Sequence, residues 1–289
     1  MKSAVVTGVS TGIGAAIASE LIAAGWQVFG SVRKGADGVA AKARLGPSFR
    51  PLVFDTTDES AVVAAAETVR AQLDGRVLHG LVNNAGIAVP DPLLVQRTAD
   101  FRRQIEVNLV GPFIVTKAFA PLLGAREGGA PDKGRIVNIS SVAGKISAPF
   151  LGAYAASKHG LEGMSASLRR ELQLFGVDVI IIGPGFVATP IWDKGEQTDI
   201  EHLRGTPWAK PFQTFGDIAI RNGRRGAAPE AIGRIVVEAL TVRKPKARYA
   251  PVAGRFLNWV MPSRLPDRLI DKLIGKKLGL HQFKKTPVK

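Results

Sequence analysis

The chain has 289 residues, of which 46% are hydrophobic, and its formal net charge is +15. It contains no cysteine, which excludes disulfides, cysteine-ligated metal sites and thiol catalysis, so we expect no metal site. The absence of cysteine fits a reducing compartment, and Met1 leads into a strand too soon for a signal peptide. No apolar run reaches the roughly 18 residues that span a bilayer. The predicted location is therefore the cytoplasm.

The first thirty residues follow the order strand, glycine turn, helix, strand. Residues 4–6 are a short apolar run, and residues 27–31 are a second one. An alanine-rich helix is expected between them, ending at Ala24 with Gly25 as its C-cap. Glycines in such a turn let backbone N–H groups approach a pyrophosphate at the helix N-terminus. The turn predicts a dinucleotide-phosphate site made by Gly8, Ser10, Thr11, Gly12, Ile13 and Gly14.

The residues after the second strand bear on which nucleotide is bound. An NAD site usually has an acidic residue there for the ribose 2′-hydroxyl, whereas Ser31-Val32-Arg33-Lys34 contains none. Arg33 and Lys34 suit a 2′-phosphate through charge-assisted hydrogen bonds. This favours NADP over NAD. The alternatives are that Arg33 is only a solvated loop residue, or that Asp37 serves as a late acid.

The alternation of strands and helices continues to about residue 183. Further strands are expected over residues 49–55, 78–82, 135–140 and 177–183. Helices are expected from Asp58, as an N-cap, to Leu73, over 98–125 with a kink at Pro112, and over 154–175. Strands joined by helical crossovers predict an α/β fold, a doubly wound Rossmann-type parallel sheet with helices on both faces in a single domain.

A tyrosine and a lysine one helical turn apart follow the predicted strand at 135–140. Tyr154 and Lys158 fall on one helix face, and Ser141 stands at the strand end, where open α/β sheets place their active sites. An ammonium close to a phenol lowers its pKa, so we expect Tyr154 to have a lowered pKa and to transfer a proton to or from an oxygen. The alternative for an isolated pair of this spacing is a surface contact.

Together these residues resemble the short-chain dehydrogenase/reductase family. The resemblance covers roughly the first 190 residues and rests on Thr7-Gly8-x-x-x-Gly12-x-Gly14, Asp55, Asn83-Asn84-Ala85-Gly86, Asn108, Ser141, Tyr154-x-x-x-Lys158, Pro184-Gly185 and Thr189. It implies that Tyr154 is the general acid/base, that Lys158 lowers its pKa and holds the nicotinamide ribose, that Ser141 orients the substrate oxygen and that Asn108 holds a water. It implies further cofactor contacts from Asp55, Thr56, Asn83, Ala85, Gly86, Pro184, Gly185, Val187 and Thr189. It also implies a homodimer or homotetramer.

Two later segments differ from the alternating pattern. Residues 189–228 contain scattered aromatic residues and are interpreted as a substrate lid, with Trp192 as a weak candidate for substrate contact; the alternative is that these side chains only pack the lid onto the sheet. Residues 251–289 are interpreted as a basic amphipathic extension to a catalytic domain of residues 1–250. Its apolar stripe begins at Leu265. We expect the extension either to pack within or between subunits or to make peripheral contact with an anionic membrane, and we do not expect it to bind nucleic acid. The sequence leaves open whether it serves the substrate pocket.

The sequence therefore predicts an NADP-dependent oxidoreductase that interconverts an alcohol and its carbonyl. The aromatic lid favours a hydrophobic substrate, and the tail loosely resembles extensions in retinol and hydroxysteroid dehydrogenases. The alternative is a non-catalytic protein that senses a nucleotide or binds a membrane on the same fold.

Overall fold

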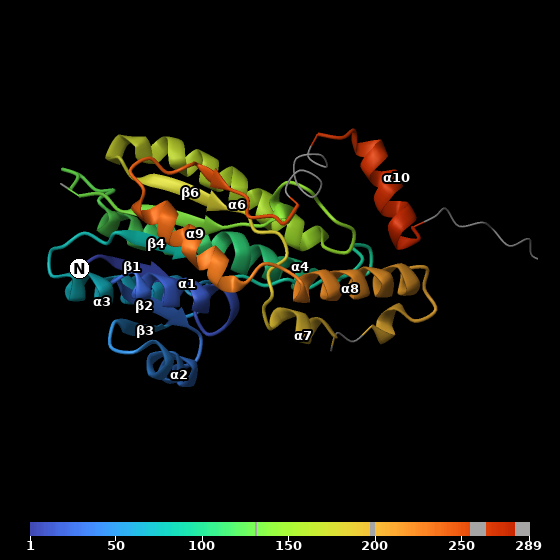
Figure 1. The fold of residues 1–289 in the computed structure, drawn as a ribbon, viewed down its shortest axis with the longest axis horizontal. Coiled ribbons are helices and arrows are strands. Elements are labelled where there is room, and N and C mark those ends of the chain that lie inside the picture. The colour runs from blue at the N-terminus through green and yellow to red at the C-terminus, as the bar shows by residue number, and fades with distance from the viewer. Residues whose placement is uncertain (131, 197–199, 255–263, 281–289) are drawn as a thin grey trace, which may run out of the picture.

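The computed structural model describes residues 1–130, 132–196, 200–254 and 264–280. In these residues the chain forms a parallel sheet of seven strands in the order β3-β2-β1-β4-β5-β6-β7 (Figure 1). The strands are β1 Ser3–Val6, β2 Gln27–Val32, β3 Phe49–Val53, β4 Gly80–Asn83, β5 Arg135–Ile139, β6 Asp178–Ile182 and β7 Arg248–Tyr249. The order reverses between β1 and β4, which is where open α/β sheets bind ligands at the strand ends. The prediction of a doubly wound parallel sheet is confirmed.

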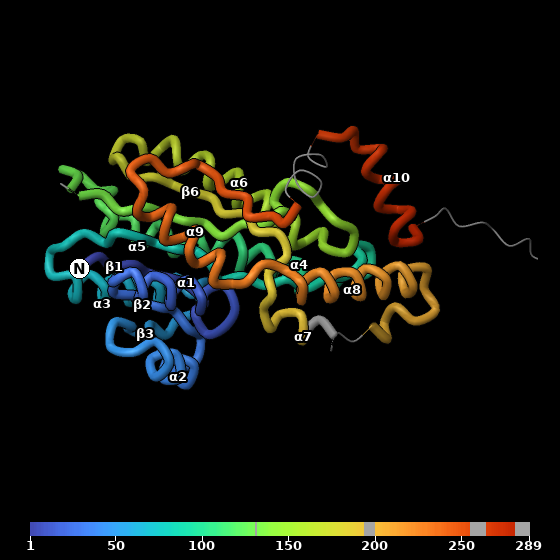
Figure 2. The backbone as a smooth tube through the Cα atoms, in the orientation of Figure 1, coloured from blue at the N-terminus to red at the C-terminus, as the bar shows by residue number. Residues whose placement is uncertain are grey.

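Helices cover both faces of this sheet. They are α1 Gly12–Ala23, α2 Gly35–Leu45, α3 Glu59–Leu73, α4 Thr98–Ile105, α5 Gly111–Phe119, α6 Gly152–Glu171, α7 Ile191–Glu196, α8 Ala209–Arg224, α9 Pro229–Thr241 and α10 Asp267–Leu278. Helices α1 and α9 lie side by side on one face (Figure 2), where Ile17, Leu21 and Val236 are fully buried. The other face is covered by α3 and α5, with Val69 and Phe119 in its core.

Burial explains why the strands read as continuous apolar runs. Ala4, Val5 and Val6 of β1 are 0% exposed because both faces of the parallel sheet are covered. Each fully buried Val, Ile or Leu contributes about 1.5–3 kcal/mol relative to an exposed side chain. Asp58 caps α3 as predicted, since its Oδ1 accepts a hydrogen bond from the Ala61 N–H at 3.0 Å.

Several helices differ from the sequence prediction. Helices α2 and α9 were not predicted, and in α2 the reason is that Gly35 and Gly38 lower its helix propensity. The predicted helix over 98–125 is divided by a π-helical turn, η1, at Glu106–Val110, followed directly by Pro112 in the first turn of α5. Such π-turns inside α-helices often occur at functional sites.

The stretch Thr98–Leu123 also bears on the membrane question. By length and composition it could cross a membrane, because its most apolar 18 residues have a mean hydropathy of 1.3, although no such run was predicted from the sequence. One helix of this kind is weak evidence for a membrane span, because core helices of globular proteins have the same length and composition. Here α4 packs against α6, and α5 packs against α3 and β4.

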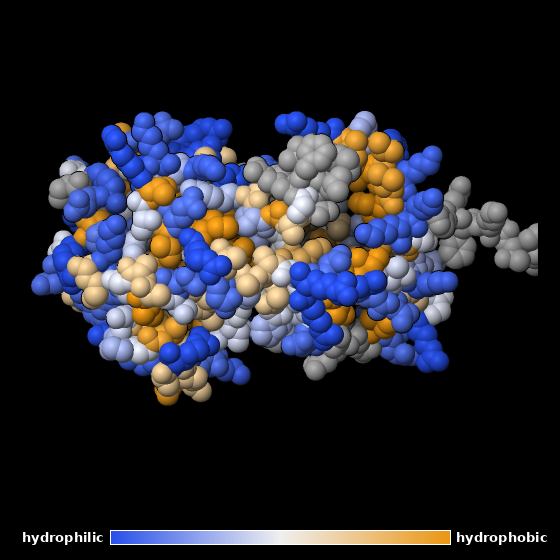
Figure 3. All heavy atoms as spheres, viewed as in Figure 1, coloured by the Kyte–Doolittle hydropathy of each residue, from blue (hydrophilic) through white to orange (hydrophobic). Residues whose placement is uncertain are grey.

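Helices α7, α8 and α10 lie beyond the carboxyl ends of the strands (Figure 1). Helices α7 and α8 lie within the predicted lid, and α10 lies within the predicted extension. Leu278 of α10 packs with Phe150 and with Phe212 of α8. On the face seen in Figure 3, apolar and charged side chains of α10 lie next to one another. Leu269 and Leu273 are 42% and 53% exposed. Residues 255–263 and 281–289 of the predicted extension lie outside the described residues.

Candidate active site

A large cavity opens at the carboxyl ends of the strands. Its volume is about 1920 Å³, roughly twice the upper size of an ordinary small-molecule site. Its walls come from the β1–α1 turn, the ends of β2, β4, β5 and β6, the start of α6, and helices α7, α8 and α10. The cavity is therefore large enough for a dinucleotide and a second sizeable molecule together.

The glycine turn after β1 is shaped for close approach of a ligand. Gly8 and Gly12 have φ angles of +73° and +61°, which side chains rarely adopt. A Cβ on Gly14 would stand 2.1 Å from the Gly8 carbonyl oxygen, so a side chain there would push the turn apart. The N-terminus of α1 has no side-chain cap and no acidic residue in its first turn, so its N–H groups and dipole suit a phosphate. All six residues predicted for phosphate binding line the cavity.

The loop after β4 is joined to this turn by hydrogen bonds of Asn84, which is not among the predicted site residues. The side-chain amide of Asn84 donates to the carbonyl oxygens of Thr7 and Gly8, at 2.9 and 3.2 Å, and Asn84 lines the cavity. The predicted cofactor residue Asn83 does not line it. The Asn83 amide is buried and donates to Thr116 Oγ1 and Asn138 Oδ1 instead. Successive strand residues point to opposite faces, which separates the two amides.

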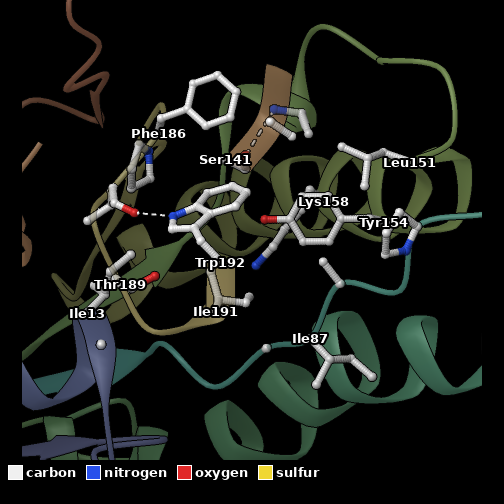
Figure 4. A pocket seen from close by; sticks show the side chains of 18 of the residues that line it. Ile13, Ile87, Ser141, Leu151, Tyr154, Lys158, Phe186, Thr189, Ile191 and Trp192 are labelled. Carbon is white, nitrogen blue, oxygen red and sulfur yellow. Dashed lines mark hydrogen bonds between the residues drawn. The ribbon is translucent and has the colours of Figure 1, made fainter. Parts of the chain in front are cut away.

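Ser141, Tyr154 and Lys158 lie together on one wall of the cavity (Figure 4). Ser141 follows β5, and its Oγ accepts a hydrogen bond from the Ala143 N–H at 3.1 Å, which starts the short 3-10 turn η3, Val142–Gly144. Tyr154 lies in the first turn of α6, and Lys158 lies one turn further on. The Lys158 ammonium donates to the Ile139 carbonyl oxygen at 2.9 Å and lies 5.8 Å from the centre of the Tyr154 ring.

The protonation of this group differs from the sequence prediction. Burial raises the pKa of the Tyr154 phenol, and a hydrogen bond with Ser141 opposes this only in part. The predicted lowering of the Tyr154 pKa is therefore wrong for the protein alone, because the sequence shows the nearby lysine but not the loss of water around the phenol. Burial also lowers the pKa of Lys158 to about 8, and the Glu162 carboxylate opposes that shift. Lys158 is thus still mostly cationic at pH 7.

Asn108 supports the site from behind. It is fully buried at the centre of η1 and does not line the cavity. Its amide donates to the Ile87 carbonyl oxygen at 2.8 Å and to Ser157 Oγ at 3.0 Å, and its Oδ1 accepts from the Ile87 N–H at 2.8 Å. Asn108 therefore connects the loop after β4 to α6. The water that the family resemblance implies for it stays a prediction.

The remaining predicted cofactor residues line the same cavity. They are Arg33, Asp55, Thr56, Ala85, Gly86, Pro184, Gly185, Val187 and Thr189. Arg33 is exposed at the end of β2, and Asp37 lines the cavity close by in sequence, whereas Lys34 does not line it. A Cβ on Gly12 would meet the Thr189 side chain at 3.4 Å, so the glycine turn and the loop after β6 form facing walls.

The end of the cavity away from the glycine turn is apolar and is built by the lid and α10. Trp192 lines it and donates from Nε1 to the Val187 carbonyl oxygen at 2.7 Å, with its ring against Gly223 of α8. Phe212 and Phe215 also line it and pack edge-to-face on Phe150, at 5.3 and 5.6 Å between ring centres. From α10 come Leu265, Ile270, Leu273, Ile274 and Lys277. The sequence left open whether the extension serves the substrate pocket, because such a contact depends on tertiary packing.

A glycine turn after the first strand and a Ser–Tyr–Lys group line one cavity, which is the arrangement expected of a dinucleotide-dependent oxidoreductase. A profile of the family described as short chain dehydrogenase matches residues 2–199. The chain therefore belongs to the short-chain dehydrogenase family, as the resemblance predicted, and is an enzyme that acts on CH–OH or carbonyl groups with a nicotinamide cofactor.

Individual relatives and solved structures agree with this assignment. The chain is 39% identical over 249 residues to an NADPH-dependent 3-dehydrocapnine reductase of Ornithobacterium rhinotracheale, covering 86% of this chain and 87% of the relative. It is 35% identical over 280 residues to mouse retinol dehydrogenase 5, covering 90% and 83%. A solved short-chain dehydrogenase/reductase from Burkholderia phymatum in complex with NAD superposes with a TM-score of 0.74 at 26% identity, covering 100% of this chain and 98% of that chain.

Proposed function

We propose that the protein is an NADP-dependent enzyme that reduces the carbonyl group of a hydrophobic substrate to an alcohol and can catalyse the reverse reaction. The observation that carries this proposal is the single cavity in which Ser141, Tyr154 and Lys158 lie between a phosphate-binding turn and an apolar wall. A bound reduced nicotinamide supplies the hydride that the carbonyl carbon accepts. The protein's own residues must then hold the carbonyl oxygen and give it a proton.

Each of the three side chains has a distinct role in this proposal. Ser141 donates a hydrogen bond to the carbonyl oxygen and orients it. Tyr154 transfers its phenolic proton to the same oxygen as negative charge develops there. The Lys158 cation then stabilises the phenolate that remains. Burial raises the pKa of Tyr154, so the protein alone holds the phenol in the protonated form that carbonyl reduction requires. Asn108 positions α6 through Ser157.

We assign the dinucleotide to the turn, the strand ends and the loop after β6. The proposed contacts are the six residues of the turn together with Arg33, Asp55, Thr56, Ala85, Gly86, Tyr154, Lys158, Pro184, Gly185, Val187 and Thr189. Asn83 is left out because its amide is buried away from the cavity. The preference for NADP is supported by the exposed Arg33 on the cavity wall and by a relative that is named NADPH-dependent.

Replacing Arg33 by Asp tests the cofactor preference. We expect the Kd for NADPH to rise about 10- to 100-fold, since hydrogen bonds to charged groups contribute about 1.5–3 kcal/mol, while the Kd for NADH stays within a few-fold. Lys34→Asp is the matched control, because it makes the same change of charge at an exposed neighbour that does not line the cavity. Fluorescence titration measures the Kd values of both dinucleotides for the wild type and for the two variants. Equal weakening of both dinucleotides by Arg33→Asp would remove the argument for a 2′-phosphate contact.

The hydrophobic substrate is proposed from the far wall of the cavity. That wall combines the aromatic residues of the lid with the apolar face of α10. We propose that the lid spans 189–228 within a catalytic domain of residues 1–250, and that α10 belongs to an extension from residue 251. One relative is named for retinol, which is an apolar alcohol. A screen of NADPH oxidation with apolar and small polar carbonyl compounds tests the proposal, and it fails if only the small polar compounds are reduced.

A pair of neighbours on α10 tests the wall directly. We expect Ile270→Asn to raise KM for a long apolar carbonyl about tenfold and leave a short one unchanged, because burying an Ile against a ligand contributes about 1.5–3 kcal/mol. Leu269→Asn is the control, since Leu269 is 42% exposed and does not line the cavity. Equal KM values for the two variants with every substrate would show that α10 does not contact the substrate.

The outward side of α10 supports a second proposal, peripheral contact with an anionic membrane. Leu269, which is 42% exposed and does not line the cavity, stands beside Arg268, Lys272 and Lys276, and apolar and basic side chains of this kind are typical of interfacial helices. Leu269→Asn should then reduce co-sedimentation with anionic liposomes, and unchanged sedimentation would exclude this contact.

We also propose a homo-oligomer, supported by Phe101 and Phe113, exposed by 37% and 53% on α4 and α5. Sedimentation velocity measures the subunit number, and a monomer at all concentrations would contradict it.

A further inference from the structure

Helix α6 carries a buried carboxylate one turn beyond Lys158. Glu162 is only 5% exposed and follows Tyr154 and Lys158 at the same spacing of four residues, so the three side chains share one face of the helix. A buried carboxylate is costly unless it is paired, so its position requires an explanation.

Glu162 is paired with an arginine from the last strand. The Arg248 Nη1 donates to Glu162 Oε2, and Arg248 belongs to β7, where it is in register with Ile181 of β6. The ammonium of Lys145 lies 3.9 Å from the same oxygen, but its side chain is 49% exposed. The other carboxylate oxygen, Oε1, is buried and makes no hydrogen bond within the described residues. The carboxylate therefore depends mainly on Arg248.

This ion pair lies directly behind Ser141. A Cβ on Gly144 would be 3.0 Å from the Glu162 side chain, so the turn η3 rests on Glu162 with no spare room. A Cβ on Gly183 would be 2.8 Å from Arg248 Nη2 and 3.4 Å from the Ser141 carbonyl oxygen. The pair thus fills the space between the turn that carries Ser141 and the helix that carries Tyr154 and Lys158.

We propose that Glu162 and Arg248 are positioning residues, which keep Lys158 in its cationic form and hold the Ser141 turn against α6. This inference rests on the proposed function, since it concerns the same proton transfer. The charged and titratable groups around Lys158 are Tyr154 and Glu162 from α6, Arg248 from β7 and Lys145 after η3. Arg103 and Glu106 line the same cavity from α4 and η1.

The sign of the electrostatic effect follows from the charges. Burial lowers the pKa of Lys158 to about 8 and Glu162 raises it, so neutralising Glu162 lowers that pKa further. Because the proposed reaction needs the Lys158 cation, this change makes carbonyl reduction fail at a lower pH. Removing the positive charge of Arg248 should raise the pKa of Lys158, because the Glu162 carboxylate then acts on Lys158 without a competing cation.

Two substitutions with opposite expected effects test the proposal. In Glu162→Gln the alkaline limb of the pH profile of kcat/KM for carbonyl reduction should move to lower pH by about half a unit or more. In Arg248→Met it should move to higher pH. Lys145→Met is the control, since its exposed ammonium is screened by water and its removal should leave the limb in place. If one variant does not fold, the other still gives a shift of defined sign.

A second readout does not depend on turnover. The rate at which acetic anhydride modifies Lys158, followed by peptide mass spectrometry as a function of pH, should give a lower apparent pKa in Glu162→Gln and a higher one in Arg248→Met. A purely structural pair would lower Tm in both variants and move neither titration. Unmoved titrations, or shifts of the same sign, overturn the proposal. If Tyr154→Phe is inactive and these titrations do not move, only the positioning proposal fails, whereas turnover by Tyr154→Phe contradicts the proposed function itself.

Discussion

Tyr154→Phe is expected to bind NADPH with nearly unchanged affinity and to reduce carbonyl compounds about 10²- to 10⁴-fold more slowly, which is the range that general acid catalysis contributes. The substitution removes one hydroxyl and leaves the ring in place. The phosphate-binding turn and Arg33 are untouched, so dinucleotide binding should be retained. Single-turnover measurement of NADPH oxidation gives the rate of the chemical step, and fluorescence titration gives the affinity.

The chain offers a matched control for this substitution. It has two tyrosines, and the second, Tyr249, lies in β7 with its hydroxyl near the Lys246 N–H at 3.4 Å, away from the cavity lining. Tyr249→Phe removes the same group and should keep kcat within about twofold. If Tyr154→Phe retained the wild-type rate, another group would have to donate the proton. If the wild-type protein bound NADPH but reduced no carbonyl compound, the non-catalytic alternative would be favoured.

The sheet and the reactive group could be predicted because their signals are local. Buried parallel strands produce continuous apolar runs, and the glycine turn, the Asp58 cap and the Tyr154–Lys158 spacing each fall within a few residues. Ser141 could be placed because it follows a strand directly, and a strand end has a known position in an open sheet. None of these inferences required knowledge of a distant contact.

The missed features depend on packing between distant segments. Asn83 and Asn84 are adjacent amides, and only the positions of Thr116, Asn138 and Thr7 decide which of them reaches the cavity. The aromatic residues of the lid were predicted either to form a pocket wall or to pack the lid onto the sheet. Phe212 and Phe215 line the cavity, and they pack on Phe150 rather than on the sheet. The direction of the Tyr154 pKa shift was wrong because burial is a property of the whole fold.

The pKa of Lys158 leads to a prediction about stability. The folded protein holds this group with a pKa of about 8, against 10.5 for an ordinary lysine. Between these two pH values the unfolded chain binds more protons, so stability rises with pH across this window. Below about pH 8 the full cost of the buried cation is present, and above about 10.5 it is absent. The difference corresponds to about 3 kcal/mol at most.

Lys158→Met should therefore inactivate the enzyme and stabilise the fold. Met fills a similar volume without charge, and the loss of the hydrogen bond to Ile139 offsets about 1 kcal/mol, so we expect a gain of about 1–2 kcal/mol in the free energy of unfolding at pH 7. The gain should shrink as the pH rises from 8 toward 10.5. Urea unfolding of the wild type and of Lys158→Met at several pH values measures this gain. Lys117→Met is the control, because Lys117 is exposed and paired with Glu59, and its free energy of unfolding should change by less than about 0.5 kcal/mol. If Lys158→Met were less stable than the wild type at pH 7, or if the difference in their free energies of unfolding did not depend on pH, burial of the Lys158 cation would not destabilise the fold. A stabilised but inactive variant would instead show that the active site retains a destabilising charge because catalysis needs it.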